Sequence, residues 1–155
     1  MKLRQGCRGW MWILPVLVID RLCKLWALRI PFHHGWIEII PGVLTFGYVE
    51  NRGMAFGMAS GMVWLLIALT AVVLAILAFY LIRHPEEPKL LRTGLWFVMG
   101  GGLGNLYDRI AYGYVVDFIR TDFIDFPVFN VADIFVCVGA AMVVLAVLMA
   151  EKRKQ

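Results

Sequence analysis

The stretch GMVWLLIALTAVVLAILAFYLI, residues 61–82, contains no charged side chain. It matches the roughly 20 apolar residues that an α-helix needs to cross a hydrocarbon core of about 30 Å. The rest of the chain agrees with it, because 61% of the 155 residues are hydrophobic and only 17% are charged. A soluble domain has an apolar share, glycine included, of about 45–50%. The composition therefore predicts an integral membrane protein.

Three further segments approach the same length, at about 9–30, 93–111 and 131–150. With residues 61–82 they predict an all-α membrane protein of four transmembrane helices, a single membrane domain over residues 1–155. The first segment continues past Asp20 and Lys24 without a small-residue cleavage site, so we interpret it as an uncleaved span and not as a signal peptide.

The basic residues predict the orientation of these spans. They gather in the N-terminal tail, in the connection around residues 83–92 and in the C-terminal tail: Lys2, Arg4, Arg8, Arg83, Lys89, Arg92, Lys152, Arg153 and Lys154. The positive-inside rule then places both termini in the cytoplasm and residues 31–60 and 112–130 on the opposite side. The net charge of +4 fits this topology and contact with anionic lipid, and nothing suggests a nucleic-acid partner.

The first extracytoplasmic segment has strand character. WIEII at 36–40 and VLTFGYVE at 43–50 are short β-rich runs, and Pro41-Gly42 between them is a turn signal. We expect a small β-hairpin or sheet at the membrane surface.

Polar residues inside the spans follow helical spacing. Asp20 and Lys24 stand four residues apart, acid before base, which favours an ion pair that faces the bundle. Such a pair either orients the first span or touches a substrate. Asn105, Asp108 and Arg109 share one helix face, as a cap or as a scaffold for other acids. Gly100 and Gly104 form a GxxxG pattern, which is typical of close helix packing.

Four of the six aspartates lie in VVDFIRTDFIDFPVFNVADIF, residues 115–135. Asn130 stands just before the last apolar run, so it can cap that helix with Asp133 at the third helical position. The helix dipole also favours a negative charge on Asp133. We interpret Asp122 and Asp125 as solvated loop charges.

Other chemistries find little support. Ser60 is the only serine, and no Lys or His lies near it in sequence to activate it. The three cysteines are scattered over a tail and two spans, and the histidines lack metal-ligand spacing, so we expect neither disulfides nor a metal or other cofactor. Asp117 and Asp133 remain as carboxylates that can meet at the outer interface. A proton-coupled transporter or a non-catalytic membrane scaffold are the alternatives.

Four motifs resemble, in order and spacing, those of the lipoprotein signal peptidases, or signal peptidase II. They are DRLCK at 20–24, NRGMAFG at 51–57, GNLYDRIAYGYVVDF at 104–118 and FNVAD at 129–133. The resemblance covers nearly the whole chain. The chain departs from the family pattern at Arg21, where the family commonly has Gln, and at Met54, where it commonly has Ala.

The resemblance implies a membrane aspartic endopeptidase of the bacterial inner membrane. Asp117 and Asp133 match the catalytic pair, and other positions match residues that support the site or bind substrate: Asp20, Lys24, Asn105, Asp108, Arg109 and Asn130. Asn51, Gly53, Ala55 and Phe56 match an extracytoplasmic loop that covers the substrate. That substrate is a diacylglyceryl-modified prolipoprotein, cut just before its lipidated cysteine, and a four-helix monomer could hold the whole site.

Overall fold

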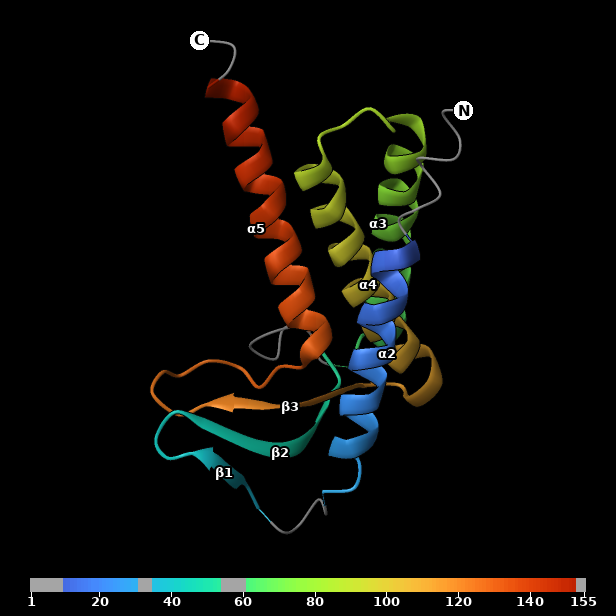
Figure 1. Ribbon diagram of the computed structural model, residues 1–155. Helices are drawn as coiled ribbons and strands as arrows, with labels where there is room; N and C mark the ends of the chain where they lie inside the picture. The colour runs from blue at the N-terminus through green and yellow to red at the C-terminus, as the bar shows by residue number, and fades with distance from the viewer. Residues whose placement is uncertain (1–9, 31–34, 54–60, 153–155) are drawn as a thin grey trace.

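The computed structural model describes residues 10–30, 35–53 and 61–152. In these ranges four helices run side by side, and a sheet lies across one end of them (Figure 1). The helices are α2 (Trp10–Ala27), α3 (Val63–Arg83), α4 (Lys89–Tyr112) and α5 (Val131–Lys152). The strands are β1 (Ile37–Ile40), β2 (Leu44–Asn51) and β3 (Val115–Thr121), which pair antiparallel in the order β1-β2-β3.

Two of these helices, α3 and α5, are long and apolar enough to cross a membrane by length and composition alone. Only 17% of each apolar window is buried inside the protein, so most of its side chains face outward, as in a lipid environment. The other two helices do not pass the same test. Helix α2 carries Asp20, Arg21 and Lys24, and α4 carries charged residues at both ends. Four helices therefore lie where four spans were predicted, but the count of four spans is not confirmed by this measure.

Glycines let α4 approach its neighbours closely. A Cβ atom on Gly100 would lie 2.9 Å from Val16, and one on Gly104 would lie 2.7 Å from the Asp20 carboxylate, both on α2. The predicted packing role of the GxxxG pattern is therefore confirmed. On the other side of α4, a Cβ atom on Gly101 would collide with the Ala132 carbonyl oxygen of α5. Helix α4 thus packs closely between α2 and α5: it meets side chains of α2 and approaches the backbone of α5.

We expect Gly101→Ala to lower the free energy of unfolding by about 1–3 kcal/mol, because a backbone carbonyl cannot move aside without shifting α5. The matched control is Gly102→Ala, whose Cβ would meet only the end of the Leu74 side chain. That side chain can move, and Ala favours a helix over Gly. Thermal unfolding in detergent measures both variants. Equal stability of the two would show that the α4–α5 contact is looser than described.

The predicted hairpin is confirmed. Strands β1 and β2 pair antiparallel, and Gly42 in the turn has a φ of 67°, a backbone conformation that favours glycine. The third strand was not predicted, since residues 112–130 were expected to form a loop. Helix α4 ends at Tyr112, and Gly113, with a φ of 78°, caps it. The chain then enters β3 after one further residue.

Strand β3 is the buried strand of the sheet. Val116, Phe118 and Ile119 pack with Ala27 at the end of α2, and Trp26 meets the Phe118 ring edge-on at a centroid distance of 6.4 Å. This contact fixes β3 beneath the helix bundle. It also determines where Asp117, in the middle of β3, can lie.

Candidate active site

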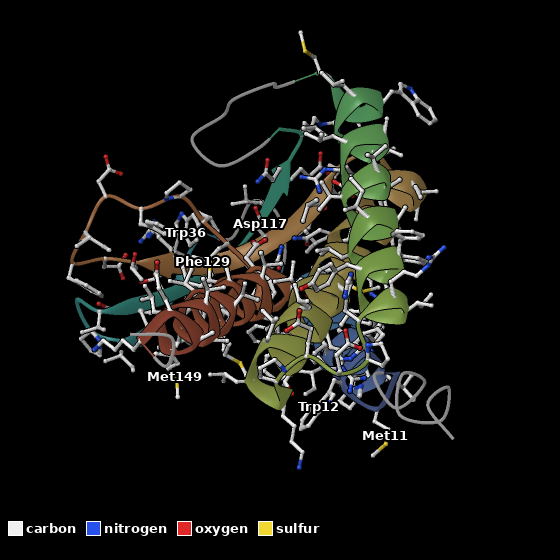
Figure 2. The ribbon with its side chains drawn as sticks, turned by 90° about the horizontal axis from the view of Figure 1, so that it is seen from above. Met11, Trp12, Trp36, Asp117, Phe129 and Met149 are labelled. Atoms are coloured by element: carbon white, nitrogen blue, oxygen red, sulfur yellow. The ribbon has the colours of Figure 1, made fainter. Side chains whose placement is uncertain are left out.

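Backbone pairing brings the two ends of the acidic stretch together. After β3 the chain turns back, and Phe129 pairs with Ile119: the Ile119 N–H donates to the Phe129 carbonyl at 2.9 Å, and the Phe129 N–H donates to the Ile119 carbonyl at 3.0 Å. The next residue, Asn130, stands immediately before α5. Asp117 consequently lies where β3 passes the first turn of α5 (Figure 2).

Asn130 and Asp133 form a reciprocal cap of α5. The Asp133 N–H donates to Asn130 Oδ1 at 3.0 Å, and the Asn130 N–H donates to Asp133 Oδ2 at 3.1 Å. This is the capping arrangement predicted from the sequence. It fixes the Asp133 carboxylate at the N-terminus of α5, where the helix dipole favours negative charge.

Asparagine amides hold both carboxylates. Asp117 accepts from Asn51 Nδ2 at 2.8 Å and from Asn130 Nδ2 at 2.6 Å. Asp133 accepts from Asn105 Nδ2 at 2.7 Å. The orientation of the Asn130 amide follows from its partners: Oδ1 accepts a backbone N–H, so Nδ2 must face Asp117. All three asparagines of the chain therefore serve this pair.

A cavity of about 470 Å³ opens beside the two acids. Its polar end is formed by Asp117, Asp133 and the side chains of Asn51, Asn105 and Arg109, and its remaining wall is largely apolar. The apolar wall comes from the β3–α5 connection and from α5: Phe126, Pro127, Val128, Phe129, Ile134, Val136, Cys137 and Val138. A few convergent polar groups in an apolar cleft of this size are typical of a ligand site.

The electrostatics of Asp117 are unusual for a carboxyl group. Its side chain is buried, and this burial, assisted by the nearby charge of Asp133, raises the pKa of Asp117 from 3.8 to about 7. The hydrogen bonds from Asn51 and Asn130 oppose the rise without cancelling it. Asp117 can therefore hold or release a proton near neutral pH, as general acid–base catalysis requires.

A buried ionic network lies behind the pair. The Lys24 ammonium is fully buried and contacts Asp20 at 2.9 Å, Asp108 at 2.8 Å and Asn105 Oδ1 at 3.0 Å. The predicted Asp20–Lys24 ion pair is thus confirmed. Because Lys24 donates to Oδ1 of Asn105, it turns the amide nitrogen of Asn105 toward Asp133.

Asp20 and Asp108 connect this network to the backbone of the site. Asp20 accepts the Ala132 N–H of α5 at 3.0 Å, and Asp108 accepts the Val116 N–H, next to Asp117, at 3.3 Å. Asp108 also binds Arg21 at 2.8 Å. Sequence reasoning missed the role of Arg21, although its position three residues before Lys24 on the same helix indicates a shared face.

The start of the expected covering loop is tied to the site. The Gly53 N–H donates to Asn51 Oδ1 at 3.0 Å, and the Gly53 carbonyl accepts from Arg109 Nη2 at 3.1 Å. Ala55 and Phe56, which were also expected to cover the substrate, lie outside the described residues, as does Met54.

Asp122 lies just past the end of β3 and is exposed, as predicted for a loop charge, but it also has hydrogen-bond partners that the sequence did not predict. Its carboxylate accepts hydrogen bonds from Thr45 Oγ1 and from Arg120 Nε, the latter at 2.8 Å. The Thr45 bond, followed by Arg120, lowers the pKa of Asp122 below its usual value. Asp122 therefore links the end of β3 to β2. Asp125 is also exposed, as expected. Neither residue lines the cavity.

Within residues 10–30, 35–53 and 61–152, no group of three His, Cys, Asp or Glu side chains is placed to hold a metal ion. The site consists instead of two carboxylates, one near its point of half-protonation, beside an apolar cleft. Such a pair can activate water and polarise a carbonyl group.

Comparisons with known proteins agree with this geometry. The family model for signal peptidase (SPase) II matches residues 12–149. A lipoprotein signal peptidase of Clostridium novyi is 41% identical over 88% of this chain and 94% of its own length. One of Symbiobacterium thermophilum is 43% identical over 88% of this chain and 91% of its own length.

A solved structure agrees as well. A bacterial membrane enzyme determined by the in meso method at 2.3 Å resolution superposes with a TM-score of 0.87 at 28% identity, covering 95% of this chain and 91% of that one. The extent of these matches, together with the ordered motifs and the paired acids, shows that the chain belongs to the signal peptidase II family of lipoprotein-processing proteases.

Proposed function

We propose that the protein is an aspartic endopeptidase that removes the signal peptide from diacylglyceryl-modified prolipoproteins, cutting just before the lipidated cysteine. The single observation that carries the aspartic mechanism is the arrangement of Asp117 and Asp133. Both line one cavity, each is fixed by asparagine amides, and the charge of one raises the pKa of the other.

Asp117 and Asp133 take different roles in this proposal. Asp117 carries the proton, because its pKa lies near 7, and it donates a hydrogen bond to the scissile carbonyl oxygen. Asp133, at the positive end of the α5 dipole, is ionised and takes a proton from a water molecule.

The reaction balances without a covalent enzyme adduct. The water oxygen attacks the carbonyl carbon and gives a tetrahedral intermediate, while its proton passes to Asp133. The C–N bond then breaks, and the proton moves from Asp133 to the departing amine. The products are a carboxylate at the end of the signal peptide and a free amino group on the lipidated cysteine. Asn51, Asn105 and Asn130 hold the acids in place throughout.

The apolar wall of the cavity accounts for a lipid-modified substrate. Phe126, Phe129 and Ile134 line the same cavity as the two acids, so a diacylglyceryl group can remain in an apolar environment while the peptide bond reaches Asp117. Asn51 and Arg109 hold the first part of the covering loop through Gly53. We propose that residues 51–57, Ala55 and Phe56 included, cover the bound substrate.

The proposed setting is the bacterial cytoplasmic membrane. In this arrangement all four helices span the bilayer, and the charged residues of α2 and α4 lie at the helix ends or are paired inside the bundle. Both termini lie in the cytoplasm by the positive-inside rule, and the sheet and the acid pair face the opposite side. A monomer holds the whole site, since every contact described above is made within one chain.

The two alternative functions lose support. A transporter places its polar site near the middle of the bilayer, often in interrupted helices. Here Asp117 lies in β3 and Asp133 in the first turn of α5, at the end of the bundle that carries the sheet (Figure 1). A scaffold has no need of an acid held near half-protonation.

A cleavage assay tests the proposal. Purified protein in detergent, with a chelator and no added cofactor or ion gradient, should cut a diacylglyceryl-modified precursor, and mass spectrometry should find the lipidated cysteine at the new N-terminus. The same precursor without the lipid is the control. Absence of cleavage, or a cut elsewhere, would overturn the proposal.

The pH dependence of cleavage follows from Asp117. Since the protonated form of Asp117 is the active one here, its population falls as the pH rises through about 7. We therefore expect kcat/KM to fall about tenfold per pH unit above that value. Initial rates between pH 5 and 9 measure this. A rate that stays level or rises up to pH 9 would contradict the assignment of the proton to Asp117.

A further inference from the structure

A second cavity has a volume of about 600 Å³. It lies on the face of α4 opposite to the α4 residues that line the catalytic cleft. Its walls are almost wholly apolar and come from Leu17, Val18 and Leu22 of α2 and from Leu103 of α4. Leu22 and Val18 are 62% and 47% exposed, so the cavity is an open groove on the membrane-facing surface of the bundle. We call it the α2–α4 groove.

A cation stands at one end of this groove. Arg21 lines the groove, and its guanidinium lies 5.0 Å from the centre of the Tyr107 ring and 5.7 Å from that of Tyr112. Nη2 binds Asp108 at 2.8 Å, whereas Nη1 makes a long contact of 3.5 Å with the Tyr112 hydroxyl, its one hydrogen bond among the described residues. The Arg21 side chain keeps 26% of its surface exposed, so Nη1 can donate to a further acceptor.

The position of Arg21 along the helix bundle indicates which acceptor is available. Arg21 contacts Tyr112, the last residue of α4, and the chain leaves the bundle for β3 just beyond it. Tyrosines at a helix end lie at the boundary between hydrocarbon and head groups. An arginine at this boundary, above an apolar groove, matches a phospholipid: the guanidinium binds the phosphate, and the groove holds an acyl chain.

The groove is distinct from the catalytic cleft. Asp20 and Gly104 form its floor, and behind them Lys24 and Asn105 separate it from Asp133. A molecule in the groove therefore cannot be the segment under cleavage. It would nevertheless lie against Asp20 and Arg21, two members of the ionic network that supports the acid pair.

The geometry points to a specific phospholipid site in the α2–α4 groove, with one acyl chain against Leu17, Val18 and Leu103 and the phosphate at Arg21. This site is separate from the proposed cleavage of prolipoproteins. It gives the surrounding membrane a direct contact with the ionic network behind the catalytic pair.

Native mass spectrometry of the full-length protein, titrated with phosphatidylglycerol in detergent, tests the site. Val18→Trp fills the groove from an exposed position, and its matched control is Val72→Trp on α3, where Val72 is 55% exposed and does not line the groove. Arg21→Gln removes the charged donor. We expect one tightly bound lipid on the wild type and on Val72→Trp, with binding about tenfold weaker in Val18→Trp and in Arg21→Gln.

A photoactivatable phosphatidylglycerol, with its reactive group at the end of an acyl chain, provides a second readout that does not depend on the variants folding well. Labelled peptides of the wild type should contain residues of the α2–α4 groove. Equal lipid affinity in all four proteins, or labelling spread evenly over the helices, would overturn the proposal. If the wild type formed a dimer and bound no lipid, and Val18→Trp abolished that dimer, the proposal would be overturned, because the groove would then hold a second copy of the chain.

Discussion

Asp117→Asn and Asp133→Asn are each expected to lower the rate of prolipoprotein cleavage by about a thousandfold or more. An amide keeps the shape of the carboxyl group but can neither hold the acid proton nor accept one from water. Asp117 is 1% exposed and bound by two asparagines, so the variant should stay in place. Initial rates with purified protein, accompanied by thermal unfolding, measure the effect and show that the fold persists.

Asp125→Asn is the matched control, because Asp125 belongs to the same acidic stretch, is exposed and lies outside the cavity. It should cleave at nearly the wild-type rate. Near-normal turnover by either Asp117→Asn or Asp133→Asn would contradict the assignment of these two residues as the catalytic pair. A loss in Asp125→Asn as large as theirs would show that the acids were wrongly chosen.

The second large effect is expected for Lys24→Met, which should lower the free energy of unfolding by about 3–5 kcal/mol, because it leaves buried carboxylates without their cation. Asp20 and Asp108 are 2% and 0% exposed. Asp108 retains Arg21, but Asp20 retains, within the part of the chain that the structure describes, only the Ala132 N–H. Loss of Lys24 also removes one of the two hydrogen bonds to Asn105 Oδ1, and the other, from Asn130 Nδ2, remains. The Asn105 amide that binds Asp133 is then held less firmly, so the cleavage rate should fall by more than the loss of stability explains. Thermal unfolding and cleavage rates measure both effects.

The double variant Lys24→Met/Asp20→Asn separates charge from packing. Asn at position 20 removes the uncompensated charge and still accepts the Ala132 N–H, so the double variant should regain part of the stability lost in Lys24→Met. If the double variant were less stable than Lys24→Met, the ionic account of the network would be wrong.

The sequence predicted much of this fold because its strongest signals are local. Uninterrupted apolar runs mark the helices, Asn130 and Asp133 have capping-box spacing, and Pro41-Gly42 marks the hairpin turn. The motifs also indicated the residues of the site. What they did not show is which donor faces which acceptor: that all three asparagines turn toward the acid pair depends on β3 pairing with β2 and with Phe129, contacts between residues far apart in the chain.

The missed features share this non-local origin. Strand β3 contains an aspartate and follows a helix directly, so it was interpreted as a loop, although Val115, Val116 and Ile119 favour a strand. The hydrogen bond between Thr45 and Asp122 was not predicted, because Thr45 lies on another strand. Arg21 was noted only as a departure from the family pattern, whereas it helps Lys24 to neutralise Asp108.

Infrared difference spectroscopy of the purified protein between pH 5 and 9 tests most directly whether Asp117 and Asp133 act as a coupled pair. The wild type should show a protonated carboxyl band that disappears with a midpoint near pH 7 and is absent in Asp117→Asn. In Asp133→Asn the midpoint should move to lower pH, because the neighbouring negative charge that raises the pKa of Asp117 has gone. A midpoint that stays the same in Asp133→Asn would contradict the account, since the two acids would then titrate independently.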